Sequence, residues 1–361
     1  MFRTRRFSLF AFVCATSAAL FPGFATPALL AQSGSEGARA YIIADATSGH
    51  ILAEKDASAK LQVASLTKIA TAAVVLDWAE AGRHGLDTLV TVPAAALAVG
   101  GQNPVGYQAG DQISLRDLLY AALLQSDNIA AETLAYHVGS KIQSGESGDA
   151  RATPVVRFVA QMNALARTLG MERTRFLNPT GFDAQEKPFS TAADMARLMR
   201  YALGKASFKF FVAQKERKIA IVRAGSQTAV AVGVPPPPAP LTALGTAPGA
   251  ASPAPSPTPP NSIGYLLRNT NELLGVKNVD GGKTGQTAKA GSCLIVTAAR
   301  EPLVKQVSDT SSEITQRRLI VVVLGAPDRF REAAALIDRG TALFDSWTAA
   351  GRPTSGAKDT L

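Results

Sequence analysis

Residues Ser65-Leu66-Thr67-Lys68 place a serine and a lysine three positions apart, at the start of a stretch rich in alanine, leucine and valine. Residues three positions apart lie on one face of an α-helix, so a helix from Leu66 to about Glu80 would project both side chains together. A serine hydroxyl is a weak nucleophile until a base removes its proton. The spacing therefore predicts that Ser65 is a nucleophile and that Lys68 is its base.

A lysine acts as a base only when its pKa is lowered, which burial and neighbouring cations both do. Lys283 is a candidate for the neighbouring cation. The backbone N–H of Ser65 would lie at the positive end of the helix, where it can stabilise an oxyanion. The structural alternative is that Ser65 only caps the helix and Lys68 is a solvated lysine of its first turn.

A second short motif, Ser126-Asp127-Asn128, interrupts a helical region. Ser114 is followed three residues later by Asp117, a capping pattern that predicts a helix from Ser114 toward Gln125. Helical periodicity resumes over residues 129–138. Such a break presents two side chains to a cleft: Ser126 would relay a proton or bridge the lysines, and Asn128 would bond a substrate amide. The structural alternative is a capped helix start.

The third motif, Lys283-Thr284-Gly285, follows Asp280-Gly281-Gly282 and precedes Gln286-Thr287. Glycines that flatten a strand, Gly285 among them, allow a substrate backbone to approach and pair along the strand edge. Lys283 would add positive potential, Thr284 a hydroxyl for a carboxylate, and the Gln286 N–H a second oxyanion donor. A plain polar turn is the structural alternative.

Histidine and metal chemistry are not favoured by this sequence. The histidines are His50, His84 and His137, and none lies in a Gly-x-Ser-x-Gly or His-Glu-x-x-His pattern. A Ser-Lys pair needs no histidine. We therefore expect no metal site and no cofactor.

The pattern of predicted elements indicates an α+β domain. Residues 40–45 and 50–54 have the composition of two short strands around a turn, and the middle of the chain is helical. Further strands are predicted over residues 218–222, 292–298 and 318–324, and further helices over 155–169, 191–203 and 332–347. We expect the N- and C-terminal parts to share an antiparallel sheet and the middle to form a helical lobe.

The N-terminus is typical of a secretory signal, which we predict over residues 1–31. Arg3, Arg5 and Arg6 precede a mostly apolar stretch over residues 7–21, and small residues then offer cleavage sites. The alternative is a membrane anchor, but the apolar run is short of the roughly 20 residues that a membrane span needs. We therefore expect an exported protein of the periplasm or cell envelope, soluble and without a transmembrane segment after cleavage.

The mature chain would carry few charges in excess and one thiol. The net charge of +9 loses three arginines with the signal and becomes +6. This surplus is spread along the chain and does not favour nucleic acid as a partner. Cys293 would be the one remaining cysteine, so we expect no internal disulfide and assign Cys293 to a strand.

A segment rich in proline, alanine, serine and threonine covers residues 233–262. Its composition predicts a disordered insertion in a catalytic domain over 35–347. The alternative is a linker between two folded domains, but Lys283 lies beyond the segment and must meet Ser65. The polar tail over 348–361 is also predicted to be disordered.

The three motifs in this order are those of class A β-lactamases and penicillin-binding proteins. Together with residues 178–183 (Asn-Pro-Thr-Gly-Phe-Asp) and 279–287, they resemble the D-alanyl-D-alanine carboxypeptidases among the low-molecular-mass penicillin-binding proteins, from about Tyr41 to Trp347. The resemblance implies a β-lactamase/transpeptidase-like fold and hydrolysis of peptidoglycan pentapeptides through an acyl-enzyme on Ser65. It implies β-lactams as covalent inhibitors, and it implies that Arg268 binds the terminal carboxylate of the substrate.

Three other functions stay open at this point. A DD-endopeptidase that cuts cross-links would use the same catalytic residues. A β-lactamase would need a glutamate that activates the deacylating water, usually in a Glu-x-x-x-Asn loop, whereas Glu172 and Asn178 are six residues apart. A wall-binding scaffold would use the proline-rich segment to dock a partner. Many members of the resembled family also carry a C-terminal β-rich domain and an anchoring helix, for which this chain is too short.

Overall fold

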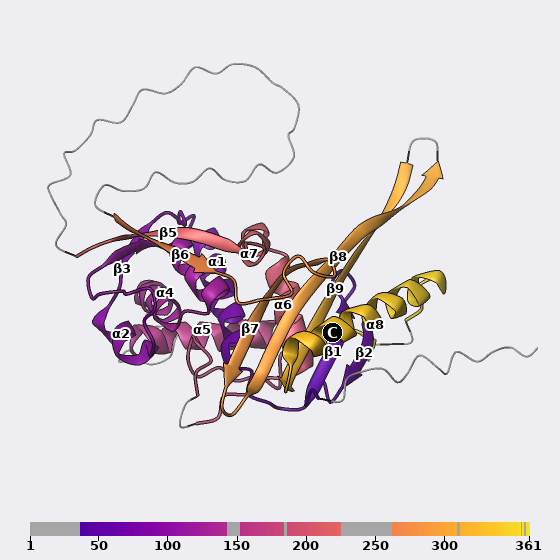
Figure 1. The fold of residues 1–361 in the computed structure, drawn as a ribbon, viewed down its shortest axis with the longest axis horizontal. Helices are drawn as coiled ribbons and strands as arrows, with labels where there is room; N and C mark the ends of the chain where they lie inside the picture. Colours follow the sequence, from indigo (N-terminus) through magenta and orange to yellow (C-terminus); the bar gives the residue numbers. More distant parts are fainter. Residues whose placement is uncertain are drawn as a thin grey trace, which may run out of the picture. The chain divides into compact units, whose positions relative to one another are not determined.

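The computed structural model describes residues 37–142, 152–183, 186–224, 262–308 and 311–361, except 355, 357 and 358. Strands of this part form two antiparallel sheets. The first has the order β2-β1-β9-β8-β7 and the second the order β3-β4-β5-β6 (Figure 1). The predicted signal over 1–31 and most of the proline-rich segment lie outside the described residues.

The five-stranded sheet joins the two ends of the chain, as predicted. Its strands are β1 (Ala40–Asp45), β2 (Ile51–Lys55), β7 (Val279–Thr287), β8 (Gly291–Ser308) and β9 (Ser311–Ala326). β1 pairs with β2 on one side and with β9 on the other. Early and late segments therefore form one sheet, and β7 is its edge strand.

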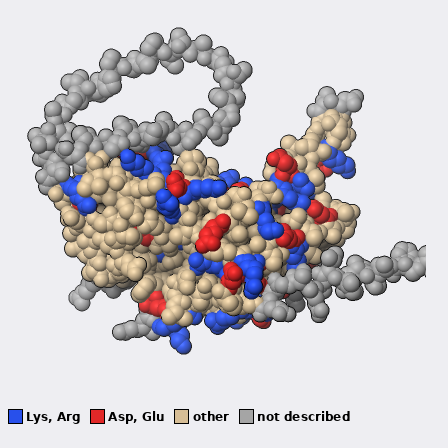
Figure 2. Space-filling model, in the orientation of Figure 1, with Lys and Arg blue, Asp and Glu red and all other residues tan. Residues whose placement is uncertain are grey.

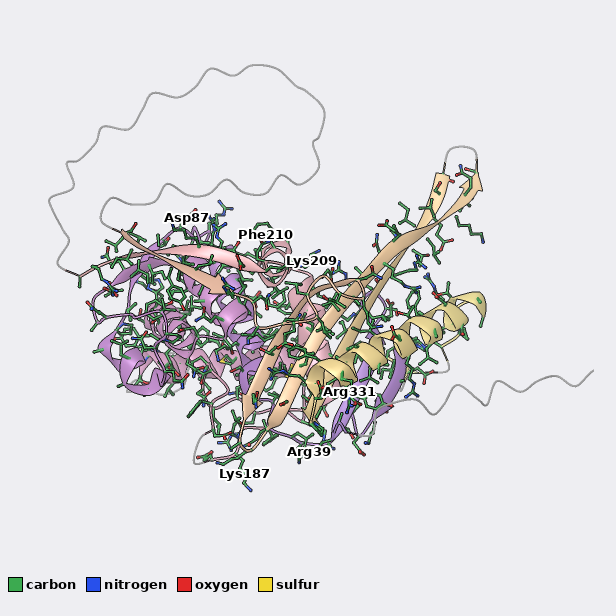
Figure 3. All side chains as sticks on the ribbon, in the orientation of Figure 1. Arg39, Asp87, Lys187, Lys209, Phe210 and Arg331 are labelled. Carbon is green, nitrogen blue, oxygen red and sulfur yellow. The ribbon has the colours of Figure 1, made fainter. Side chains whose placement is uncertain are left out.

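Both faces of this sheet are covered by apolar packing, which explains the continuous apolar run in β9. Ile42, Ile320 and Val322 belong to a core shared with the helical lobe. Ile43 and Val321 belong to a second core, formed with the last helix. Because successive strand residues point to opposite faces, an unbroken apolar run is what a doubly covered sheet requires. The described side chains are shown in Figure 3.

Along the sequence, most of the helices lie between β2 and β7, that is, between the early and the late strands of the large sheet. They are α1 (Lys68–Ala81), α2 (Ala94–Gly100), α3 (Leu115–Tyr120), α4 (Asn128–Lys141), α5 (Pro154–Thr168), α6 (Ala192–Leu203), α7 (Ala206–Val212) and α8 (Arg329–Ala349). Helix α8 packs on β1, β8 and β9, and α6 packs on β1 and β9. Helix α1 is buried along most of its length, as expected for a helix that is apolar on every side.

The four-stranded sheet was largely missed by the sequence reasoning. It consists of β3 (Leu89–Thr91), β4 (Gln112–Ser114), β5 (Glu216–Val222) and β6 (Ser262–Arg268), of which only β5 was predicted. Strands of three residues are too short to show a period of two. Strands β5 and β6 pair with each other, Val222 opposite Ser262, so residues 223–261 connect two neighbouring strands of one sheet.

Strands β8 and β9 are much longer than the predicted runs over 292–298 and 318–324. The pairing of β7 with β8 reaches Ala298, and the pairing of β1 with β9 reaches Leu319. Farther out in the described sheet, the rest of β8 and the first part of β9, which starts at Ser311, pair only with each other and form a two-stranded ribbon (Figure 1). The ribbon is mostly exposed, and its mixed polar and apolar residues gave no buried-strand pattern.

The end of the chain also differs from the prediction. Helix α8 extends to Ala349, into the tail predicted to be disordered over 348–361. The backbone N–H of Leu361 donates to the carbonyl of Gly49 at 2.9 Å, and Thr360 bridges to His50. The last residues therefore contact the turn between β1 and β2.

No helix in the described ranges has the length and apolarity needed to cross a membrane. Basic and acidic side chains are interspersed on the face of the molecule seen in Figure 2.

Candidate active site

Ser65 and Lys68 lie where a 3-10 turn, Ala64–Thr67, leads into α1. Ser65 is inside this turn and Lys68 is the first residue of α1, so the helix begins slightly later than predicted. Lys68 is fully buried. Its Nζ lies 2.9 Å from Ser65 Oγ, and it donates to Asn128 Oδ1 at 2.7 Å and to the carbonyl of Thr180 at 2.9 Å. The predicted pair is therefore in hydrogen-bonding contact.

The environment of Lys68 suits a base. Burial lowers its pKa from 10.5 to about 7, against the opposing effect of the carboxylates of Asp127 and Glu132. A neutral amine has two N–H groups and one lone pair. With both N–H groups on the carbonyl oxygens of Asn128 and Thr180, the lone pair is left for the hydroxyl of Ser65.

Asn128 and Ser126 are positioned by an unusual helix ending. After α3 the chain forms a π-helical turn, Ala121–Gln125, and Ser126 then adopts the left-handed conformation, with φ of 64°. Such a conformation is uncommon for a residue with a side chain, and π-helical turns and strained residues are frequent at functional sites. Asp127 caps α4 by accepting from the N–H of Ala130 at 2.8 Å. Asn128, at the start of α4, thereby meets Lys68.

The turn at Asn178-Pro179-Thr180-Gly181 is a further part of the site. Asn178 Oδ1 accepts from the N–H groups of Thr180 and Gly181, at 3.2 and 2.7 Å, which fixes the turn. The turn presents the Thr180 carbonyl to Lys68 and the Pro179 carbonyl to the hydroxyl of Thr71, at 2.6 Å. Sequence reasoning assigned only a turn here, because the contribution of Thr180 comes from its backbone.

Strand β7 passes directly against the Ser65 turn. A Cβ atom on Gly285 would lie 2.9 Å from the Val63 carbonyl and 3.1 Å from the Ser65 nitrogen, so only glycine fits without displacement. Gly285 pairs with Cys293 of β8. The other edge of β7 has no partner strand in the described sheet, which leaves backbone groups such as those of Gln286 open to a substrate.

Lys283 is buried in β7 and its Nζ donates to the Thr284 carbonyl at 2.8 Å. Burial lowers its pKa well below 10.5, and the positive charges of Lys68 and Arg329 lower it further. Lys283 was predicted to lower the pKa of Lys68, but the charges that act on Lys68 are those of Asp127 and Glu132.

Thr284 is tied to the helical side of the site. Its Oγ1 lies 2.6 Å from Thr270 Oγ1, and Thr270 Oγ1 donates to the carbonyl of Leu124 at 3.1 Å, in the π-helical turn before Ser126. The hydroxyl of Thr284 is therefore oriented through Thr270 by the same turn that positions Ser126. Thr270 was not predicted, since a threonine in a loop carries no distinguishing pattern.

The family model of the D-alanyl-D-alanine carboxypeptidases matches residues 29–230, more than half of the chain. The chain belongs to this family. DacC, a D-alanyl-D-alanine carboxypeptidase of Escherichia coli K12, is 32% identical over 357 residues, covering 96% of this chain and 72% of DacC. A D-alanyl-D-alanine endopeptidase of Pseudomonas aeruginosa PAO1 is 28% identical over 279 residues, covering 76% of this chain and 72% of that protein.

The fold is shared with solved structures of DD-peptidases. The Streptomyces K15 DD-transpeptidase matches with a TM-score of 0.65 at 24% identity, covering 86% of this chain and 99% of that chain. This likeness confirms the predicted α+β fold of the β-lactamase/transpeptidase type, with an antiparallel sheet flanked by helices.

Arg268, assigned by resemblance to the carboxylate of the substrate, lies at the end of β6, two residues before Thr270, whose hydroxyl contacts Thr284. The side chain of Arg268 is 75% exposed, and its charged partner in the described chain is Glu216, at 3.7 Å. Arg329, at the start of α8, donates to the Gly285 carbonyl at 3.1 Å and to Gln286 Oε1 at 3.4 Å. Arg329 is therefore a further arginine in contact with the Lys-Thr-Gly strand, and the sequence reasoning missed it.

Cys293 is structural, as expected. It is buried in β8, and burial raises the pKa of its thiol to about 11. A thiol with such a pKa is protonated at neutral pH and is a poor nucleophile.

Proposed function

We propose that this member of the D-alanyl-D-alanine carboxypeptidase family removes the terminal D-alanine of peptidoglycan pentapeptides through an acyl-enzyme on Ser65. One observation carries the proposal: Lys68 Nζ lies 2.9 Å from Ser65 Oγ while two carbonyl oxygens occupy its N–H groups. A pKa of about 7 lets this amine be neutral at working pH and still accept a proton.

Acylation begins when Lys68 takes the proton of Ser65 Oγ, which attacks the carbonyl carbon between the two D-alanines. The N–H groups of Ser65 and Gln286 would stabilise the oxyanion. The C–N bond then breaks, and Lys68 returns its proton, with Ser126 as a relay, to the amine of the leaving D-alanine. A water molecule hydrolyses the ester and restores Ser65.

Recognition of the substrate would use both sides of the site. The Nδ2 of Asn128 can donate to a peptide carbonyl, because its Oδ1 is held by Lys68. Thr284, Lys283 and Gly285 line the strand against which the terminal D-alanine would lie. We propose that Arg329 supplies positive charge for the terminal carboxylate, a role first assigned to Arg268, because Arg329 contacts Gly285 and Gln286.

β-Lactams would acylate the same serine. A penicillin mimics the acyl donor, and the glutamate that deacylates class A β-lactamases has no counterpart in the Glu-x-x-x-Asn pattern here. We expect penicillin to stay bound to Ser65 for minutes or longer. Rapid turnover of penicillin by the pure protein would instead identify a β-lactamase.

We also propose that the protein acts outside the cytoplasm, in cell wall biogenesis and the control of cell shape. The basic and then apolar character of residues 1–31 supports export to the periplasm through a cleaved signal.

The activity is tested with a pentapeptide ending in D-Ala-D-Ala. Release of D-alanine by the wild-type protein and its loss in Ser65→Ala are the expected results. A folded protein that releases none would disprove the proposal.

An endopeptidase is the second candidate, favoured by the likeness to the Pseudomonas aeruginosa endopeptidase. Purified cross-linked muropeptide dimers separate the two: an endopeptidase would yield monomers, whereas a carboxypeptidase would only shorten pentapeptide stems.

A further inference from the structure

A hollow lies next to Thr180, whose carbonyl accepts a hydrogen bond from Lys68. It has a volume of about 330 Å³ and is formed by α2, α4, the start of α5 and the turn after Asn178. Three large apolar side chains line it while remaining exposed: Val99 at 63%, Tyr136 at 38% and Phe182 at 57%. Exposed apolar side chains gathered around one hollow are typical of a binding site.

Glu132 lines this hollow with a carboxyl group that has no partner. The residue is only 7% exposed, and its carboxylate forms no hydrogen bond or ion pair with any residue in the described ranges. Burial raises its pKa to about 7, against the opposing effect of Lys68. A buried carboxylate without a partner is costly, so a cation that entered the hollow would be bound favourably.

The hollow and the catalytic residues share structural elements. Glu132 lies four residues after Asn128, on the same face of α4. Thr180 lines the hollow and also accepts a hydrogen bond from Lys68. The hollow therefore adjoins the elements that hold Lys68, within reach of a side chain of a molecule bound at Ser65.

The charges on the two sides of the site are opposite. Strand β7 contributes Lys283 and the start of α8 contributes Arg329, whereas the hollow is lined by the carboxyl groups of Glu132 and Asp183. Asp183 Oδ1 accepts from Thr287 Oγ1 at 3.0 Å, which holds it at the end of β7. A substrate with a carboxylate at one end and an amine on a side chain would match both sides.

We propose that this hollow, the Glu132 pocket, binds the alkylammonium side chain of the diamino acid that precedes the acylating D-alanine in the stem peptide. The inference rests on the proposed carboxypeptidase function and adds its selectivity. The alkyl chain would pack against Val99 and Tyr136, and the ammonium group would pair with Glu132. Stem peptides whose side-chain amine is free are then preferred over those whose amine is acylated.

The test uses two pentapeptides with lysine at the third position, one with a free ε-amine and one with the amine acetylated. We expect the full-length protein to prefer the free amine at least tenfold in kcat/KM for D-alanine release. In Glu132→Gln the preference should fall to about onefold. The ratio cancels any change in the basicity of Lys68, because both peptides react through the same lysine.

Two further variants complete the experiment. Glu80→Gln removes an equivalent carboxylate on α1 that pairs with Lys205, and it should keep the preference. Val99→Lys places a cation at an exposed position of the rim and should reduce the preference several-fold without disturbing the core. It replaces Glu132→Gln if that variant fails to fold.

Labelling of Ser65 by a fluorescent penicillin distinguishes a failure of the proposed function from a failure of the pocket alone. A protein that neither labels nor releases D-alanine overturns the proposed function, and the pocket with it. A protein that labels and releases D-alanine but treats both peptides alike overturns the pocket alone. The same holds if the folded Glu132 and Val99 variants keep the full preference of the wild type.

Discussion

Lys68 and Lys283 are both buried in the same site, but the charges around them have opposite sign. Lys68 lies near the carboxylates of Asp127 and Glu132, which raise its pKa against the effect of burial. Lys283 lies near Lys68 and Arg329, which lower its pKa in addition to burial. The acidic neighbours keep the helix lysine able to accept a proton near neutral pH, whereas the cationic neighbours of the strand lysine lower its pKa further.

The comparison indicates a division of labour. A base must change its protonation state during the reaction, and a pKa near the working pH makes both directions possible. Lys283 instead has its amine fixed on the Thr284 carbonyl, on the strand where a negatively charged substrate group would lie. The two lysines should therefore differ in how their removal affects rate and pH dependence.

The largest effect is expected from Lys68 and its partner. Ser65→Ala and Lys68→Ala should each lower kcat/KM at least several hundred-fold, because the pair acts as one unit. The double variant should lose little more than either single variant. Single-turnover acylation by a fluorescent penicillin measures the effect directly, and an additive double variant would show that the two residues act separately.

Lys283→Met should lower kcat/KM by about a hundredfold, the size of loss seen when one group that stabilises developing charge is removed. The rise of activity with pH should keep its midpoint near 7, since this midpoint belongs to Lys68. Rates measured from pH 5 to 9 check both statements. A midpoint that moves with Lys283 would contradict the assignment of the base.

The two arginines give a smaller and sharper contrast. Arg329→Ala should raise KM roughly tenfold or more, because a charged hydrogen-bond donor beside Gln286 is lost. Arg268→Ala should stay within about twofold, since an exposed ion pair contributes little. Steady-state kinetics of D-alanine release compare the two variants. If the two variants lost equal activity, Arg268 would again be a candidate for binding the terminal carboxylate.

Glu132→Gln is expected to shift the pH profile, measured with a substrate that has no side-chain amine, rather than to lower the maximal rate. Activity rises with pH as Lys68 loses its proton, and the Glu132 carboxylate helps retain that proton. Its removal should lower the pKa of Lys68 and move the rising limb to lower pH, which raises relative activity at pH 6 by less than about tenfold. Asp77→Asn, on the far part of α1, is the control. A shift to higher pH would contradict the electrostatic account.

Residues whose side chains act together and lie close in the sequence could be predicted from the sequence. Ser65 and Lys68 share a helical turn, and the spacing itself indicated their contact. Thr180 acts through its carbonyl, and Thr270 through a contact with Thr284, so neither has a signal in its own side chain. Arg329 reaches Gly285 only because helix α8 follows β9 in a sheet whose order the sequence did not give in detail.

The same limit applies to the fold. The apolar runs over 292–298 and 318–324 predicted the buried parts of β8 and β9, because a strand covered on both faces needs apolar residues at successive positions. The four-stranded sheet depends on strands of three residues and on the pairing of β5 with β6, which no local pattern records. The ribbon of β8 and β9 is mostly exposed, so it has no continuous apolar run from which its strands could be predicted.

The contacts of Lys68 also have a consequence for how the protein acquires its activity. Its hydrogen bonds reach Asn128, 60 residues away, and Thr180, 112 residues away. Contacts between distant segments form only after the chain has closed long loops, which makes them slow. On refolding from denaturant, helical circular dichroism should return first and penicillin labelling of Ser65 last, so that catalytic competence reports the final step of folding.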